Sequence, residues 1–234
     1  MTFAEKILRF NSSLSLDNNR LPERIEAMNP FRDENSDLIN KLTSLFYHKY
    51  YNDDHPRKLI LGINPGRLGA GATGIPFTDT KRLSGDCHIP VSEIKTHEPS
   101  SVFVYEMISA FGGTELFYKS FYISSVSPLG FVKINEKGKA LNFNYYDRVD
   151  LQNAVLPFIL KTIRLQLEFG IDTKTCFCLG TGKNFKFLKK LNGEYGFFNK
   201  IVPLEHPRYI MQYKSKQKQQ YIEKYMQLLR DGQS

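Results

Sequence analysis

The sequence predicts a three-layer α/β/α fold around a central four-stranded, mainly parallel sheet. Two observations lead to this expectation. Short apolar runs typical of strands alternate with helical patterns along the chain, which implies crossover connections between parallel strands. No internal repeat or long low-complexity segment divides the 234 residues. We therefore expect a single domain over 1–234, with an N-terminal helical extension over about 1–55 and a core over about 56–234.

The predicted strands are short apolar runs, and the first two stop at turn-forming residues. The first run stops at Asn64-Pro65-Gly66 and the second at Ser127-Pro128. The four runs are 58–63, 121–126, 175–179 and 200–204. Because ligands bind beyond the carboxyl ends of parallel strands, the segments that follow should meet at one edge of the sheet. These segments are 64–77, 124–130 and 205–213.

Helical spacing of apolar residues, together with capping signals, predicts the helices. Asn35-Ser36-Asp37 is a good N-cap region for the first, and Gly112-Gly113 ends the second. Pro157 is expected to kink or break the third. The predicted helices are 36–50, 101–111, 148–169, 183–190 and 215–230.

Composition excludes several classes of protein. Apolar residues make up 41% and charged residues 24%, which is ordinary globular usage and argues against a disordered chain. No stretch approaches the roughly 18 consecutive apolar residues of a membrane span, and the N-terminus lacks the apolar run of a secretory signal. Three cysteines make no disulfide framework, so we expect a cytoplasmic protein without a membrane partner.

The positive charge is concentrated near the C-terminus. The net charge is +8, and the segment 183–231 holds 11 Lys and Arg against 4 Asp and Glu, a net of +7. A local positive field of this kind attracts polyanions, above all nucleic acid. A solvated lysine face that serves solubility is the alternative explanation, and charge alone does not separate the two.

Several segments resemble ligand motifs but lack the required context. Gly69–Gly74 satisfies G-x-G-x-x-G, yet Ile75-Pro76 follows and cannot open a regular helix. Gly180–Lys183 lacks the first glycine and the Ser or Thr of a phosphate loop. Cys176 and Cys178 have no second cysteine pair or nearby histidine, so a zinc site is not expected. The sequence therefore predicts no cofactor and no metal.

Three side chains at the predicted ligand edge suit recognition of a flat polar ligand. Asn64 places a neutral amide at the end of a strand, and Pro65 forces it into an extended conformation. Phe77, beside a rigid proline, can stack on a flat ligand. His206 opens the basic region, where large apolar residues among cations suit a wedge into stacked bases. Taken singly, a turn residue, a core aromatic and a structural histidine are the simpler explanations.

Together these residues resemble a known family. Gly62-Ile63-Asn64-Pro65-Gly66, followed by Thr73-Gly74-Ile75-Pro76-Phe77, resembles the first motif of the single-strand-selective monofunctional branch of the uracil-DNA glycosylase superfamily. His206-Pro207-Arg208 resembles its second motif, in which a His-Pro pair begins the DNA-inserting loop. Ser127-Pro128-Leu129 stands where the family has Cys-Pro-Leu. The similarity covers about 55–215 and is greatest to the bacterial second subgroup.

The resemblance implies a monofunctional repair glycosylase that hydrolyses the N-glycosidic bond of a flipped-out uracil. Asn64 would position the attacking water, Phe77 would stack on the base, and His206 would hydrogen-bond the base O2. The residues expected to bind the base are Gly62, Ile63, Pro65, Gly66, Gly74, Phe77, Ser125 and Asn142. The residues expected to bind DNA are Pro207, Arg208, Tyr209, Ile210, Met211, Lys214 and Lys216. We expect a bacterial, nucleoid-associated monomer whose partner is DNA containing uracil or another deaminated base.

One position departs from the family. Ser125 stands where the family has its base-reading asparagine, and a hydroxyl cannot make the paired donor and acceptor contact of an amide. Other deaminated bases such as xanthine could therefore be accepted, and Asn142 or Asn144 could replace the missing amide. Two alternatives stay open: a non-catalytic nucleic-acid-binding protein on the same fold, and a nucleotide-dependent enzyme that uses Gly69–Gly74.

Overall fold

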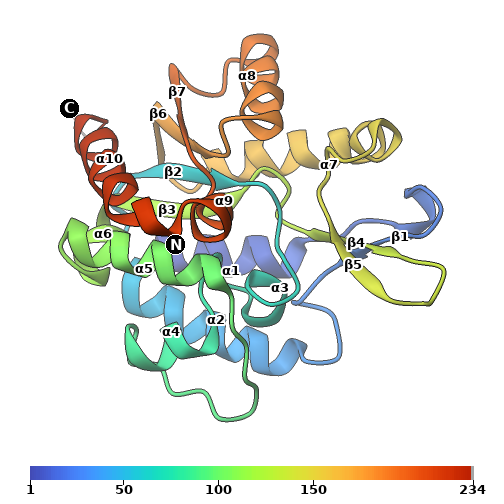
Figure 1. Cartoon of the computed structure of the whole chain (residues 1–234), viewed down its shortest axis with the longest axis horizontal. Helices are drawn as coiled ribbons and strands as arrows, with labels where there is room; N and C mark the ends of the chain where they lie inside the picture. Colours follow the sequence, from blue (N-terminus) through green and yellow to red (C-terminus); the bar gives the residue numbers. More distant parts are fainter. Residues whose placement is uncertain (233–234) are drawn as a thin grey trace.

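The structure, a computed structural model that describes residues 1–232, is centred on a four-stranded sheet (Figure 1). Its strands are β2 (Arg57–Gly62), β3 (Phe121–Ser125), β6 (Ile171–Leu179) and β7 (Lys200–Leu204). They lie in the order β3-β2-β6-β7, and every neighbouring pair is parallel. The predicted α/β fold is confirmed, and each predicted strand overlaps one of these four.

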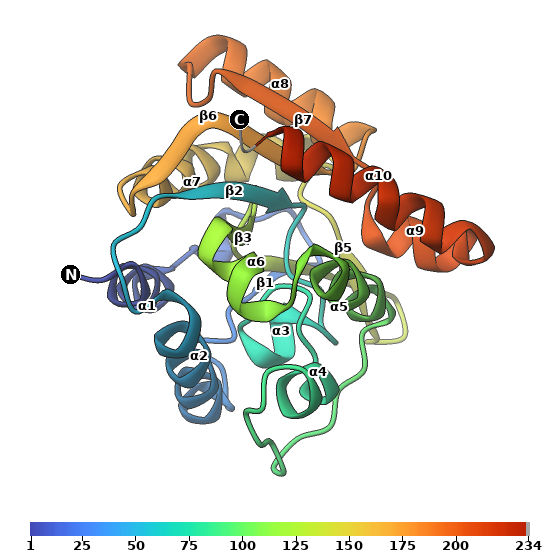
Figure 2. The same cartoon turned by 90° about the vertical axis from the view of Figure 1, so that its left-hand side faces the viewer.

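Helices cover both faces of this sheet. They are α1 (Phe3–Ser13), α2 (Ser36–Tyr51), α5 (Pro99–Phe111), α6 (Thr114–Ser120), α7 (Val149–Leu167), α8 (Lys183–Tyr195) and α10 (Lys218–Asp231). Figures 1 and 2 show α7 and α8 on one side of β6 and β7, and α5 and α10 on the other. Helix α6 packs against β2 and β3, and α1 packs against α2.

The strand β2 is the centre of the core. All six of its residues are buried, as expected for a central parallel strand covered on both faces. Its first residue, Arg57, is fully buried and donates hydrogen bonds to the carboxylate of Asp53 and to the carbonyl of Tyr118. The guanidinium also lies 4.8 Å from the centre of the Phe3 ring. These contacts fix α1 and α6 against the start of β2, and leave its carboxyl end for the site.

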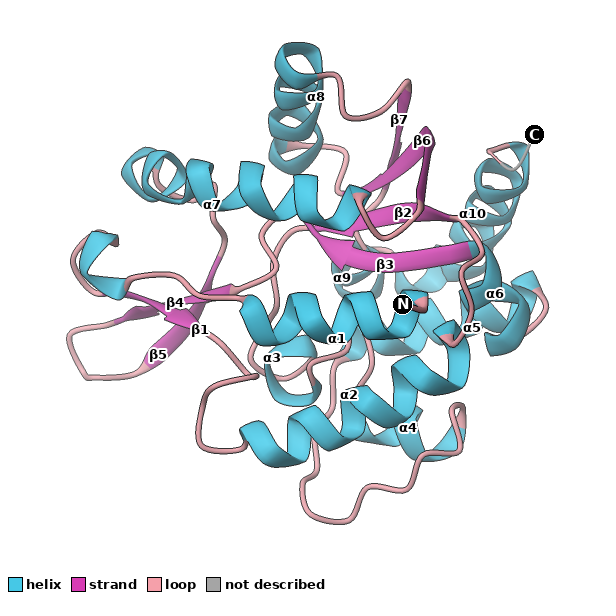
Figure 3. Ribbon diagram, turned by 180° about the vertical axis from the view of Figure 1, so that it is seen from behind, coloured by secondary structure: helices cyan, strands magenta, loops and turns pink. Residues whose placement is uncertain are grey.

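A second, three-stranded antiparallel sheet lies beside the first (Figure 3). Its strands are β1 (Ile25–Met28), β4 (Gly130–Ile134) and β5 (Ala140–Phe143), in the order β1-β4-β5. The N-terminal segment that was expected to be helical contains α1 and α2, and in addition β1, which pairs with β4. The β4–β5 hairpin, which follows Ser127-Pro128, returns the chain toward the carboxyl ends of the parallel strands.

The helical predictions need two corrections. Of the two outcomes expected at Pro157, a kink or a break, the structure excludes the break, because α7 continues through Pro157 over 19 residues. Its buried face, which includes Leu151, Val155 and Ile159, holds the helix against the core where Pro157 lacks a main-chain hydrogen bond. No helix within residues 1–232, α7 included, combines the length and apolar character that crossing a membrane requires.

The second correction concerns the C-terminal part of the chain. The predicted helix over 215–230 is divided into the short η2 (Ser215–Gln217) and α10, and a separate helix, α9 (Pro207–Tyr213), precedes them. The other short helices, which the sequence did not predict, are η1 (Asn18–Arg20), α3 (Ala70–Thr73) and α4 (Thr80–Gly85). Helix α9 follows β7 directly and presents its first turn to the carboxyl edge of the sheet.

Candidate active site

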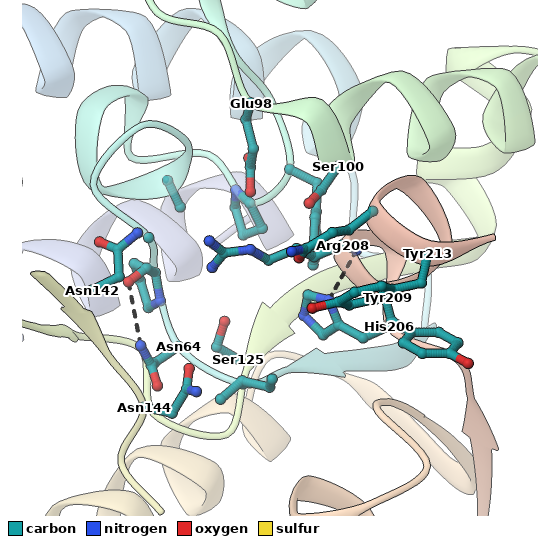
Figure 4. A pocket seen from close by; sticks show the side chains of 17 residues that line it. Asn64, Glu98, Ser100, Ser125, Asn142, Asn144, His206, Arg208, Tyr209 and Tyr213 are labelled. Carbon is teal, nitrogen blue, oxygen red and sulfur yellow. Dashed lines mark hydrogen bonds between the residues drawn. The ribbon is translucent and has the colours of Figure 1, made fainter. Parts of the chain in front are cut away.

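A cavity of about 270 Å³ lies at the carboxyl ends of the parallel strands (Figure 4). All three segments that were expected to converge contribute to it. The lining comprises Ile63, Asn64, Pro65, Gly66, Ala70, Pro76, Phe77, Glu98, Ser100, Ser125, Asn142, Asn144, His206, Arg208, Tyr209, Gln212 and Tyr213. In Figure 4, Asn64 and His206 lie on opposite sides of the cavity, and the side chain of Arg208 reaches over the space between them.

The side chain of Asn64 is held in one orientation by the backbone after β5. Its Nδ2 donates to the carbonyl of Phe143 at 3.2 Å, and its Oδ1 accepts from the N–H of Tyr145 at 3.1 Å. A further contact joins Nδ2 to the carbonyl of Pro65. Because the amino group faces carbonyl oxygens and the oxygen faces an N–H, these contacts fix which way the amide points. Because Oδ1 has two lone pairs and accepts one hydrogen bond within the described residues, it has the capacity to accept another.

His206 is a neutral hydrogen-bond donor. It is the N-cap of α9, and its Nδ1 accepts from the N–H of Arg208 at 3.1 Å. Nδ1 is therefore unprotonated, and the ring hydrogen is on Nε2. Burial, reinforced by the positive charge of Arg208, lowers the pKa of His206 to about 4. At pH 7 the imidazole is uncharged and can donate one hydrogen bond from Nε2.

Phe77 forms the aromatic wall of the cavity next to His206. The two ring centres lie 5.7 Å apart, and Phe77 is buried with a left-handed backbone, at φ 53°. Thr73 stabilises this turn, because its hydroxyl donates to the carbonyl of Thr78 at 2.6 Å. Gly74 serves the same turn and lies outside the cavity lining. Its φ is 72°, and a Cβ there would come within 2.7 Å of Thr43.

Comparisons with known proteins identify the family of this chain. The family profile of the uracil DNA glycosylase superfamily matches residues 48–230. The chain belongs to the uracil-DNA glycosylase superfamily. It is a DNA N-glycosylase, and its solved-structure matches include wild-type Pedobacter heparinus SMUG2. That crystal structure has a TM-score of 0.95 and 57% sequence identity, over 99% of this chain and 98% of that chain. No curated protein matches the chain.

The floor of the glycosylase cavity carries three polar side chains. Ser125 ends β3, and no hydrogen bond to its hydroxyl is found within residues 1–232. Asn142 and Asn144 come from the end of β5, and the Oδ1 of Asn142 accepts from the N–H of Arg67 at 3.2 Å. Gly62, behind the floor, allows close packing, since a Cβ there would lie 3.4 Å from Ser125 and 3.5 Å from Phe77. Gly62 therefore shapes the cavity from behind without lining it.

The rim of the cavity comes from α9. Arg208, Tyr209 and Tyr213 are exposed, the last at 66%, and all three line the cavity. Met211 lies in a neighbouring hollow of about 470 Å³, which shares Gly66, Glu98, Ser100, Asn142, Arg208 and Gln212 with the cavity. Ile210 is fully buried, so the prediction that it contacts DNA is wrong. The helical turn of α9 explains this, because it directs Ile210 into the core while its neighbours face solvent.

The remaining predicted contacts on this side differ in exposure. Pro207 is buried at the first position of α9, where its fixed backbone angle suits a helix start. Lys214 and Lys216 follow α9, and neither forms an ion pair within the described part of the chain. Lys218, next along, pairs with Glu106. The free positive charge beside the cavity is therefore carried by Arg208, Lys214 and Lys216.

Among the lining residues that the sequence analysis missed is a carboxyl group, that of Glu98. Its Oε2 is buried and has no hydrogen-bond partner. Burial and the negative charge of Asp79 raise the pKa of Glu98 to about 7, against the opposing effect of Arg208. The carboxyl lies against Gly69, where a Cβ would come within 2.0 Å of Oε2. Nothing in the local sequence marks Glu98, because distant segments bury it.

The glycine-rich segment and the cysteine pair are engaged within the fold. In the Gly69–Gly74 segment, the N–H groups of Gly69 and Gly71 both donate to the carbonyl of Gly66, so they do not form a phosphate cradle. Cys176 and Cys178 are fully buried within β6. Across residues 1–232, no cluster of three or more His, Cys, Asp or Glu side chains is arranged to hold a metal ion.

Proposed function

We propose that this glycosylase excises uracil from DNA by hydrolysing the N-glycosidic bond of a nucleotide rotated out of the helix into the cavity. One observation supports this above all others: an oriented amide, a neutral imidazole donor and an aromatic wall line the same cavity. Extrusion is required because the bond to be broken is inaccessible in stacked DNA.

His206 stabilises the departing base. When the bond between C1′ and N1 breaks, its electron pair goes to the uracil, and negative charge develops on O2. A neutral Nε2–H can donate to this oxygen without an unfavourable proton transfer, since the imidazole stays neutral at pH 7. The donor is already in place before the reaction, because the N–H of Arg208 holds the ring through Nδ1.

Asn64 positions the water that completes the reaction. Its Oδ1 keeps one lone pair after accepting from Tyr145, and this lone pair can accept a hydrogen bond from water. A neutral amide cannot remove a proton as a carboxylate does. The C1′ cation therefore forms before the water oxygen adds to it, and the proton released passes to the solvent or to the departed uracil anion. No lysine lines the cavity within residues 1–232, which supports hydrolysis without a lyase step.

The same site is proposed to accept other deaminated bases. Ser125 offers a small, uncommitted hydroxyl where a larger amide would restrict the pocket, so xanthine is a candidate substrate besides uracil. DNA is proposed to lie along α9 and to contact Arg208, Tyr209, Met211, Lys214 and Lys216, with the protein acting as a monomer on genomic DNA in the bacterial cytoplasm.

The experiment is an excision assay with the full chain. Oligonucleotides that carry one uracil, xanthine or hypoxanthine are incubated with the protein, and abasic sites are revealed by alkaline cleavage. We expect excision of uracil in single-stranded or duplex DNA, with no cleavage before the alkaline step. Binding of these oligonucleotides without release of any base would instead identify a non-catalytic DNA-binding protein.

A further inference from the structure

The cavity contains a side-chain amide, that of Asn144, which takes no part in the proposed bond cleavage. Asn144 lies between β5 and α7 and lines the cavity. Its backbone is fully engaged, because its N–H donates to the carboxylate of Asp147 at 2.8 Å and its carbonyl accepts from the N–H of Asp147 at 3.0 Å. Its side chain makes no hydrogen bond within residues 1–232. The donor and the acceptor of this amide are therefore both available to a ligand.

Asn64 determines where this free amide lies. Two of its hydrogen bonds go to Phe143 and Tyr145, the residues on either side of Asn144. With Asp147 holding the backbone of Asn144 itself, the segment 143–145 is fixed by four hydrogen bonds. Figure 4 shows the Asn144 side chain in the same corner of the cavity as Asn64. An immobilised backbone reduces the entropy lost when the side chain binds a ligand.

The neighbouring amide, Asn142, is placed differently. Its Oδ1 already accepts from the N–H of Arg67, so it cannot offer a fully free acceptor beside its donor. It also borders the outer hollow next to Leu68 and Met211, whereas Asn144 borders only the inner cavity with Phe77, Ser125 and His206. Of the two amides, Asn144 is the one that faces the proposed place of the base.

We propose that Asn144 reads the polar edge of the extruded base. Nδ2 of Asn144 donates to O4 of uracil, and Oδ1 accepts from N3–H, while His206 donates to O2 from the opposite side. The paired contact that Ser125 cannot provide is thus supplied from a different strand. This assignment rests on the proposed excision of uracil, and it names the residue that recognises the base.

The test separates recognition from chemistry. Binding is measured for two matched oligonucleotides, one with 2′-fluoro-2′-deoxyuridine, whose glycosidic bond resists cleavage, and one with a tetrahydrofuran abasic analogue that has no base. Single-turnover excision of uracil is measured in parallel. The variants are Asn144→Ala and Asn144→Asp, which keeps the shape but removes the donor. The control is Asn153→Ala, which removes an exposed asparagine on α7 that does not line the cavity.

We expect Asn144→Ala and Asn144→Asp to lower the preference for the base-containing oligonucleotide by about ten- to a hundredfold, and the excision rate by at least as much. Affinity for the abasic analogue and the melting temperature should not change, because the side chain has no partner in the protein. Asn153→Ala should leave both the preference for the base and the excision rate unchanged.

Two results would overturn the assignment. One is wild-type preference and rate in both Asn144 variants. The other is an equal loss of affinity for the abasic analogue, which would mean that Asn144 supports the backbone without contacting the base. If the wild-type protein excises no base at all, the proposed function itself fails, and that outcome is visible before any variant is compared.

Discussion

Polar side chains are held by hydrogen bonds in the inner cavity, whereas those on the α9 rim have few partners within the protein. In the inner cavity, Asn64 and His206 are each held by hydrogen bonds to backbone groups. On the rim, Tyr213 ends α9, and Lys214 and Lys216 follow it without ion pairs among the described residues. The difference indicates that the groups assigned to bond cleavage are preorganised, whereas those assigned to DNA contact can adapt to a flexible polymer.

The largest effect is expected for His206→Ala. Loss of a single preorganised donor to a developing anion lowers the rate by about 100- to 1000-fold. Single-turnover excision of uracil measures this, with circular dichroism to verify folding. His48→Ala, which removes an exposed imidazole on α2, is the control and should leave the rate unchanged. A wild-type rate for His206→Ala would remove the imidazole from the mechanism.

Asn64→Ala should follow, with a loss of at least about tenfold in rate. Because Tyr145 then loses its acceptor, its amide hydrogen should also exchange faster with solvent deuterium. A closely matched control exists at Asn192, whose side chain makes the same pair of backbone hydrogen bonds to Phe198, at 2.8 Å each, but lies on α8. Asn192→Ala should leave excision unchanged, and an equal loss of rate there would show that any such clamp affects activity.

Glu98, the buried carboxyl between the cavity and the rim, should make the free energy of unfolding depend on pH. The pKa of Glu98 is raised to about 7 in the folded protein, so the folded state loses stability as pH rises from about 4.5 through 7. Glu98→Gln should therefore increase the free energy of unfolding at pH 8, by at most about 3 kcal/mol, and should have no effect at pH 4. Urea unfolding at both pH values measures this. The control is Glu136→Gln, which changes an exposed carboxyl. An equal gain in the free energy of unfolding for this control would show that burial of Glu98 is not the cause.

Removing the charges of the rim lysines should have a smaller effect, which is on affinity for DNA. Lys214→Gln with Lys216→Gln should weaken affinity for DNA several-fold and lower the slope of log affinity against log salt by about 1 to 2. Lys186→Gln with Lys189→Gln removes the same charge from α8. If both pairs change the slope equally, the overall charge attracts DNA and the rim has no special role.

The smallest effect is an expected absence of pH dependence. With the pKa of His206 lowered to about 4, the imidazole does not titrate between pH 5 and 8. Excision by Glu98→Gln, which lacks the other titrating group, should therefore be flat across this range. An inflection near pH 6.5 would mean that His206 ionises as an ordinary histidine does.

The sequence was informative where function depends on strand ends. Asn64, Phe77 and His206 follow predicted strands, and the parallel arrangement alone implied that they would converge. Ile210 could not be separated from its neighbours, because a helix of seven residues sends one side chain inward and the next outward, and the sequence did not predict α9.

The parts that were missed depend on contacts between distant segments. The strand β5 is short and half exposed, and only its pairing with β4 defines it. Glu98 is buried by segments around Gly69 and Arg208, which no local pattern connects. Asn144 was one of two alternatives in the sequence, and only the hydrogen bonds of its neighbours distinguish it from Asn142.

The double hydrogen bond of Asn64 limits how such an enzyme can be altered. Aspartate at this position would offer a stronger base for water, yet its carboxylate would face the carbonyl of Phe143, to which the amide now donates. Faster hydrolysis would then come with a displaced loop and less discrimination among bases. In the proposed mechanism the same side chain places the water and anchors the segment that carries Asn144, so a substitution at position 64 should change both the rate and the choice of base.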